Sequence, residues 1–131
     1  MPAYFLVAFG GALGSVARSW LSGLIAERYG HAFPWNTLLV NVTGSLVIGF
    51  LAALTEPEGR GLASPATRQF FMVGICGGYT TFSSFSLQTL NLLRDREWLY
   101  AGGNVVLSVV LCMVAVWIGY LLGAAVQSRP R

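Results

Sequence analysis

The sequence predicts an all-α membrane protein with four transmembrane helices. Of its 131 residues, 55% are apolar and 10% are charged, and the mean hydropathy is +0.65, which are values typical of the membrane class. Four apolar stretches are each long enough to cross a bilayer, which takes about 20 residues per helix. Only short connections remain between them, so we predict a single multi-pass transmembrane domain over residues 1–131.

Composition also argues against several other classes of protein. The net charge of +3 is carried by arginine alone on the basic side, and no basic stripe forms, so we expect no nucleic-acid partner. Cys76 and Cys112 fall in predicted spans, without CxxC spacing and with no histidine nearby in sequence. We therefore interpret both cysteines as small apolar fillers rather than as metal or redox groups.

The first predicted helix runs from about Ala3 to Ile25. Gly10, Gly11 and Gly14 form a small-residue surface of the GxxxG type, which allows another backbone to come close. Arg18 interrupts the apolar run, and an arginine inside a span is costly unless it reaches the membrane edge or finds a partner. We interpret it as a structural anchor at the membrane edge or on a loop carbonyl, and attraction of an anion is the alternative.

The second predicted helix, about Trp35 to Leu54, carries a polar stripe. Thr37, Asn41 and Ser45 recur at every fourth residue and so lie on one face. Such a stripe either holds neighbouring helices together or lines a pathway. Asn41 is the informative member, because an amide at that depth must find hydrogen-bond partners.

The third predicted helix, about Thr67 to Leu93, is expected to be broken at its middle. Gly77 and Gly78 are poor helix formers, and the hydroxyls of Thr80 and Thr81 compete for backbone groups, so the helix should fail between these two pairs. Backbone groups freed inside a bilayer are tolerated only where they face protein, an ion or water. The break is therefore a functional-site candidate, and a kinked packing helix is the alternative.

Beyond this break the third helix carries aromatic and hydroxyl side chains at helical spacing. Phe82 and Phe85 share a face, and Ser83, Ser86 and Thr89 follow one another every three residues. Ordinary packing is the usual role of such an aromatic pair. The hydroxyls continue the polar character of the break toward the end of the helix.

The fourth predicted helix, about Trp98 to Val126, repeats the pattern of the second. Asn104, Ser108 and Cys112 recur at every fourth residue and share a face. Two helices therefore present polar stripes.

Arginines are almost evenly divided between the two sides of the predicted membrane domain. The side that holds both chain ends and the loop Glu56–Ala66 carries four, and the opposite side carries three, which are Arg60, Arg68, Arg129 and Arg131 against Arg28, Arg94 and Arg96. Because the arginine and lysine difference sets orientation, this balance predicts insertion both ways up. Two opposite copies can then pair about an axis in the membrane plane, which brings both breaks together.

Three features together resemble the Fluc (CrcB-type) fluoride channels, and the resemblance covers essentially the whole chain. They are the run from Gly77 to Ser86, Asn41 within Asn-x-x-Gly, and Arg18 after a glycine-rich stretch. The resemblance implies a passive channel, not an enzyme, that exports fluoride across the plasma (inner) membrane through two pores of an antiparallel dual-topology homodimer. It also implies a sodium ion at the dimer interface, held by the backbone carbonyls of Gly77 and Thr80.

The resemblance also assigns roles to individual side chains. Phe82 and Phe85 would face fluoride, while Arg18 and Gly78 would be structural. Fluoride is small and strongly hydrated, so a pore must replace its water with hydrogen-bond donors, and the positive edge of an aromatic ring suits an anion. The expected pathway consists of Asn41, Thr81, Phe82, Ser83, Phe85, Ser86, Asn104 and Ser108.

Two other functions stay open at this point. A four-helix drug/proton antiporter would have a similar length, but proton coupling needs a titratable residue, usually an acid, inside a span. All five acids fall at predicted helix ends or in loops, namely Glu27, Glu56, Glu58, Asp95 and Glu97. A structural subunit of a larger membrane complex would conduct no ions when purified alone.

Overall fold

In the computed structural model, residues 2–55 and 64–128 are described, and all of their regular structure is helical. The elements in order are α1 (Pro2–Tyr29), α2 (Trp35–Leu54), α3 (Pro65–Arg68), the π-helix η1 (Gln69–Cys76), α4 (Gly77–Tyr79), α5 (Phe82–Arg94) and α6 (Trp98–Gln127). Four segments are long and apolar enough to cross a membrane, the third being Pro65–Arg94. The chain is a multi-pass membrane protein. Five charges used in the topology and antiporter arguments, Glu56, Glu58, Arg60, Arg129 and Arg131, lie outside the described residues.

Local signals explain where the first span ends and where the third begins. α1 continues past the predicted end at Ile25 to Tyr29, because the polar residues there are compatible with a helix. It stops where Gly30 takes a positive φ of 77°, a conformation that glycine adopts readily at helix ends. α3 begins at Pro65, and the side chain of Ser64 caps its N-terminus, which is a favourable start for a helix.

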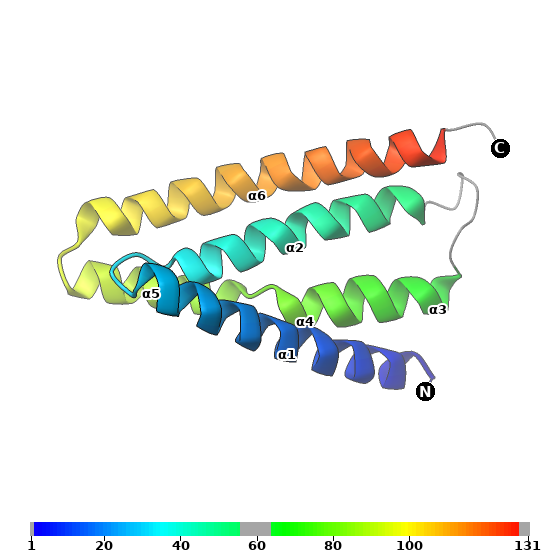
Figure 1. The fold of residues 1–131 in the computed structure, drawn as a ribbon, viewed down its shortest axis with the longest axis horizontal. Helices are drawn as coiled ribbons and strands as arrows, with labels where there is room; N and C mark the ends of the chain where they lie inside the picture. Colours follow the sequence, from blue (N-terminus) through cyan, green and yellow to red (C-terminus); the bar gives the residue numbers. More distant parts are fainter. Residues whose placement is uncertain (1, 56–63, 129–131) are drawn as a thin grey trace.

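α2 and α6 lie side by side along most of their length (Figure 1). Glycines let the two backbones come close: a Cβ on Gly123 would lie 2.6 Å from the carbonyl oxygen of Phe50, and a Cβ on Gly49 or Gly119 would also meet the facing backbone. Small residues at a helix interface favour this kind of packing in membranes. The α2–α6 pair therefore has a tightly defined register, with Leu38 fully buried.

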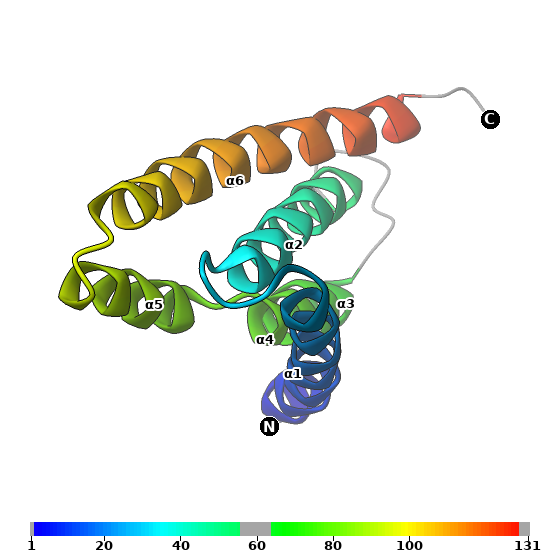
Figure 2. The same ribbon diagram turned by 60° about the vertical axis from the view of Figure 1, so that its left-hand side comes forward.

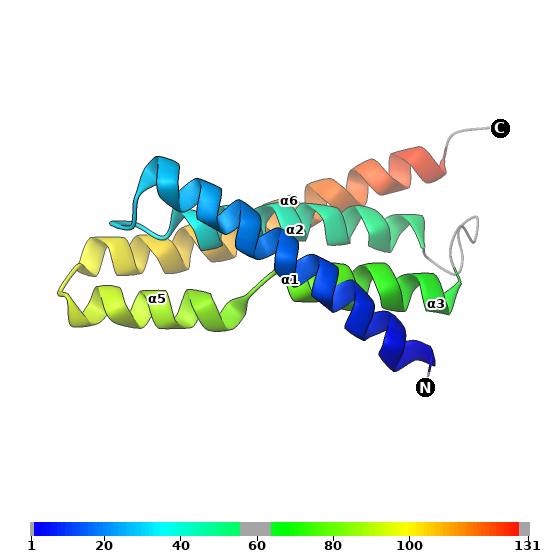
Figure 3. The same cartoon turned by 60° about the horizontal axis from the view of Figure 1, so that its bottom comes forward.

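α1 crosses the first half of the third span at an angle (Figure 3). Here the small-residue surface predicted on the first helix meets a backbone: a Cβ on Gly10 would lie 3.0 Å from the Cα of Gly74, and one on Gly14 would meet the carbonyl of Ile75. From the other side, a Cβ on Gly78 would lie 2.6 Å from the Gly11 carbonyl oxygen. This crossing fixes α1 against η1 and α4.

The third span differs from a regular α-helix in two ways that affect the site. Its first half contains the π-helical segment η1, and such segments are often found at functional sites. Its second half, α5, is joined to α4 by an extended stretch and to the start of α6 by a tight turn (Figure 2). Among its residues only Leu92 is buried. In the first half, Gly74 and Cys76 are buried, so the second half is the more exposed of the two.

Candidate functional site

The helix break in the third span consists of two extended residues, Thr80 and Thr81. Their φ and ψ angles are −84° and 158° for Thr80 and −151° and 116° for Thr81. The sequence predicted failure between the glycine pair and the threonine pair, and the helix does end there, at Tyr79, with Gly77 and Gly78 still helical in α4. Gly78 is needed for the close approach to Gly11, which explains a glycine inside a helix without a break there.

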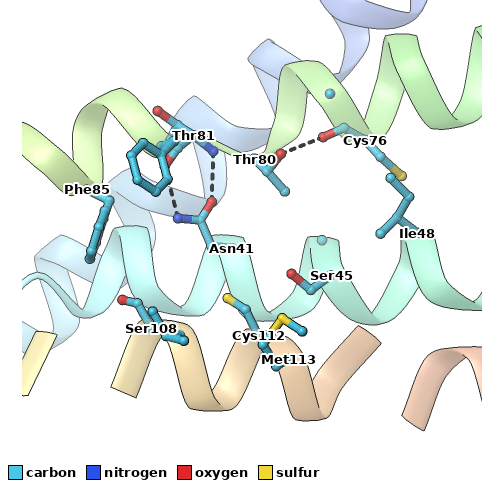
Figure 4. A pocket seen from close by; sticks show the side chains of 14 residues that line it. Asn41, Ser45, Ile48, Cys76, Thr80, Thr81, Phe85, Ser108, Cys112 and Met113 are labelled. Carbon is cyan, nitrogen blue, oxygen red and sulfur yellow. Dashed lines mark hydrogen bonds between the residues drawn. The ribbon is translucent and has the colours of Figure 1, made fainter. Parts of the chain in front are cut away.

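Asn41 of α2 holds this extended stretch through both ends of its amide. Its Nδ2 donates to the Thr81 carbonyl at 2.9 Å, and its Oδ1 accepts from the Thr81 N–H at 2.8 Å (Figure 4). The side chain thus pairs with the backbone as a neighbouring strand would. Backbone groups exposed by the break would be costly in a bilayer without such partners, so Asn41 makes the interruption stable.

Two backbone carbonyls lose their usual donors at the break. In an unbroken helix the N–H of Thr81 would donate to the Gly77 carbonyl, but here it donates to Asn41. The N–H of Ser84 would likewise serve the Thr80 carbonyl, but here it donates to the Thr81 hydroxyl at 3.2 Å. Both carbonyl oxygens named in the sodium prediction are therefore released from helical bonding.

Arg18 reaches the break from α1. Its Nε donates to the Gly78 carbonyl at 3.2 Å, and the hydroxyl of Ser15 donates to the same oxygen at 3.5 Å. This geometry agrees with a structural anchor on a carbonyl. The contact satisfies another acceptor that the break exposes, and it gives the guanidinium a partner inside the span.

A cavity of about 370 Å³ lies between α2, the third span and α6 (Figure 4). It brings together seven of the residues predicted for the site, which are Asn41, Gly77, Thr80, Thr81, Phe82, Phe85 and Ser108. Its lining also includes residues that the sequence did not assign to the site, among them Gly44, Cys76, Cys112 and Met113. The cavity is mainly apolar, with a few polar groups near the break.

Phe82 and Phe85 lie together at one end of this cavity. Their ring centroids are 5.3 Å apart and the planes are tilted by 54°. Phe85 is half-buried, whereas Phe82 is 78% exposed on the surface of the single chain. The Phe82 ring therefore contacts the cavity and also forms part of the outer surface of the chain.

The sequence model of the family described as "CrcB-like protein, Camphor Resistance (CrcB)" matches residues 5–120. The chain belongs to this family. It is also similar along nearly its whole length to proteins named "Fluoride-specific ion channel FluC". The identity is 61% with the protein of Opitutus terrae, covering 98% of this chain and 97% of that one. It is 60% with that of Rhodospirillum rubrum, covering 90% and 92%, and 53% with that of Methylocella silvestris, covering 95% of each. The resemblance inferred from the motifs is confirmed.

In this CrcB-like chain, three predicted pathway residues do not line the cavity. Ser83 and Ser86 are exposed on the outer side of α5, where the Ser86 hydroxyl donates to the Phe82 carbonyl at 3.0 Å. Asn104 is only 1% exposed, and its Nδ2 donates to Thr89 at 2.9 Å. The polar positions that share helical spacing are thus divided between the cavity, the outer surface and the contact of α5 with α6.

The CrcB-like chain has a smaller polar cavity of about 80 Å³ on another side of the break. Arg18, Thr37, Ser84 and Gln88 are among the residues that line it. The Oε1 atom of Gln88 is buried and has no hydrogen-bond partner among the described residues. Buried acceptors of this kind are normally satisfied by water. The sequence contained no signal for this cavity, because its walls come from three separate spans.

Proposed function

We propose that this chain is a passive, fluoride-selective channel, not an enzyme, that exports fluoride across the plasma (inner) membrane. The observation that carries the proposal is the match over 98% of the chain, at 61% identity, to a protein named fluoride-specific ion channel FluC. The site agrees in its chemistry. A mainly apolar cavity beside a stabilised helix break provides a few donors and aromatic edges for a small anion.

Fluoride must exchange its hydration shell for protein donors along the route. Asn41 uses one N–H for the Thr81 carbonyl and retains a second, because a primary amide has two. Ser108 lines the same cavity and adds a hydroxyl. The edges of Phe82 and Phe85 offer weak positive potential without the strong binding that a buried cation would cause. Conduction requires such moderate binding, since each ion must also leave.

We infer that the working channel is an antiparallel dual-topology homodimer with two pores. Support comes from Phe82 and Gly77, which are exposed on the single chain although they lie beside the cavity, and from the balanced arginines. The break lies halfway along the span Pro65–Arg94, so a two-fold axis at mid-membrane would bring both breaks together.

A topology experiment tests this dimer. Reporters fused to the C-terminus should detect both orientations in one membrane. Adding three lysines to the tail should force one orientation and abolish efflux, which an oppositely biased copy should restore. A single orientation for the unmodified chain would exclude the antiparallel dimer.

We also infer a sodium ion at the dimer axis, bound by the carbonyls of Gly77 and Thr80 from each chain. The fit rests on the two carbonyls that the break releases from helical bonding. Oxygen ligands without carboxylates suit a hard monovalent cation better than calcium or zinc. Replacing sodium by a large organic cation during reconstitution should lower efflux, and unchanged efflux would exclude a required sodium ion.

The decisive experiment is fluoride efflux from liposomes that contain the purified chain. We expect efflux without an imposed proton gradient and little chloride efflux under the same conditions. Efflux that depends on a proton gradient would favour an antiporter, and no efflux would favour a structural subunit. The antiporter is already disfavoured, because Glu27, Asp95 and Glu97, the acids among the described residues, all lie at helix ends.

A further inference from the structure

Asn104 lies behind the cavity rather than in its wall. It is 1% exposed, and it sits one helical turn before Ser108, which is 8% exposed and lines the cavity. The Ser108 hydroxyl donates to the Asn104 Oδ1 at 3.3 Å. An ion in the cavity can therefore reach Ser108, whereas it meets Asn104 only through Ser108.

A chain of hydrogen bonds fixes which way the Asn104 amide faces. The Thr89 hydroxyl donates to the Phe85 carbonyl at 2.8 Å, and a carbonyl can only accept. Thr89 has then used its single proton, so it must accept from the Asn104 Nδ2 at 2.9 Å. The amide oxygen is consequently turned toward Ser108. A flipped amide would place two acceptors against each other at Thr89.

This direction has a consequence for an anion in the cavity. Ser108 has one proton, and at rest that proton points to Asn104, so its oxygen lone pairs are left toward the cavity. Fluoride needs a donor at that position. The hydroxyl must therefore leave Asn104 before it can donate to the ion, and the long bond of 3.3 Å makes that exchange inexpensive.

We propose that Asn104 is a positioning residue. Its amide oxygen accepts the Ser108 proton when no ion is present, and it thereby weakens fluoride binding at this point of the route. The inference rests on the proposed function. Asn104 does not contact the ion. It sets the fluoride affinity through Ser108, because the Asn104 oxygen and fluoride compete for the single Ser108 proton. Weaker binding speeds release, which is useful in a channel.

The test compares Asn104→Leu, Ser108→Ala and the double variant in fluoride efflux from liposomes over a range of fluoride concentrations. Asn104→Leu keeps the approximate shape but removes the competing acceptor, so the half-saturating fluoride concentration should fall about threefold to fivefold. Ser108→Ala should raise it by a similar factor. In the Ser108→Ala background, Asn104→Leu should have no further effect.

Asn36→Leu is the matched control. Asn36 also donates to a hydroxyl of another helix at 2.9 Å, that of Ser22, so its loss removes a comparable interhelical bond that does not touch Ser108. We expect lower thermal stability and an unchanged half-saturating concentration. Thr89→Val provides a second route if Asn104→Leu does not fold. Thr89→Val frees the Asn104 amide to turn. The half-saturating fluoride concentration should therefore fall, but by less than in Asn104→Leu.

Two results would overturn the inference. One is a higher or unchanged half-saturating concentration in both Asn104→Leu and Thr89→Val, and the other is a shift that persists when Ser108 is alanine. Both results presuppose efflux by the wild-type chain and so leave the proposed function intact. A wild-type chain that passes no fluoride would instead refute the proposed function, and this inference with it.

Discussion

The two halves of the third span are held in opposite ways. Before the break, η1 and α4 pack backbone to backbone against α1, with Gly10, Gly14 and Gly78 at the crossing. After the break, α5 is tied to α6 by the side-chain hydrogen bond from Asn104 to Thr89, and it leaves Phe82 exposed. One half has no room for a side chain at its contacts, whereas the other half depends on particular side chains.

This difference suggests that the first half of the span supports the fold, whereas the second half governs the passage of ions. Substitutions before the break should act on folding, because a packed backbone cannot move to accommodate an added group. Substitutions after it should act on ion flux while the fold survives, because the side chains there are exposed or lie at the cavity. The following predictions test that division, from the largest expected effect to the smallest.

The first prediction concerns the glycine crossing. Gly14→Ala puts a methyl group against the backbone of Ile75 and Tyr79, and overpacking of this kind costs about 1 to 3 kcal/mol. We expect a large loss of monodisperse protein in size-exclusion chromatography and a lower Tm. Gly23→Ala is the matched control in the same helix, because nothing lies within 4 Å of its added Cβ. Equal stability of the two variants would contradict a close-packed crossing.

The second prediction concerns Asn41, the side chain that holds Thr81 in the break between the two halves. Asn41→Asp retains an acceptor for the Thr81 N–H but loses the donor to the Thr81 carbonyl, and an ionised carboxylate would repel fluoride. We expect strongly reduced efflux at neutral pH. As the pH falls, protonation should restore one donor and part of the flux, with the oligomeric state unchanged. Wild-type efflux at neutral pH would show that Asn41 only joins helices.

The third prediction compares aromatic rings on either side of the break. Phe82→Ile and Phe85→Ile preserve apolar character but remove the positive ring edge, so efflux should fall by about tenfold or more while the protein stays folded. Phe71→Ile in η1 is the control, because Phe71 is also partly exposed but does not line the cavity. Similar losses in all three variants would indicate a general packing effect.

The smallest effects are expected at the anchor on the Gly78 carbonyl. Arg18→Gln removes a charged donor at 3.2 Å, but a glutamine amide can still donate to a carbonyl, so we expect a smaller loss of Tm than for Gly14→Ala. Ser15→Ala removes only a long bond of 3.5 Å to the same oxygen and should lower Tm far less. Thermal unfolding in detergent measures both. A larger loss for Ser15→Ala would show that Arg18 is not the main anchor.

Much of the fold could be predicted from the sequence, because the span lengths and the small-residue surface are local patterns. The bounds of α2 agree with the prediction, and α6 begins at the predicted Trp98. The position of the break was predicted as well, since α4 ends at Tyr79, between the glycine pair and the threonine pair. The extended conformation of both threonines was not predictable, because it depends on Asn41, far away in sequence, which pairs with Thr81.

The candidate site was predictable by residue type but not by placement. Helical spacing assigns Ser83, Ser86 and Ser108 to faces, but it does not say what each face meets. The structure places Ser108 at the cavity and the other two serines on the outside. Likewise, no periodic pattern could indicate the buried carbonyl of Gln88 or the π-helical segment η1, which both depend on neighbouring spans.

The pairing of Asn41 with Thr81 also bears on how the protein is made. Asn41 leaves the ribosome 40 residues ahead of Thr81, so its amide reaches the membrane before the partners that it will finally bind. An unpaired amide in hydrocarbon is costly, as are the backbone groups of the extended stretch. Each of these two defects is relieved only by the other. Insertion of the third span should therefore be driven partly by α2, so that biogenesis proceeds as a cooperative step in which the two segments enter as one unit.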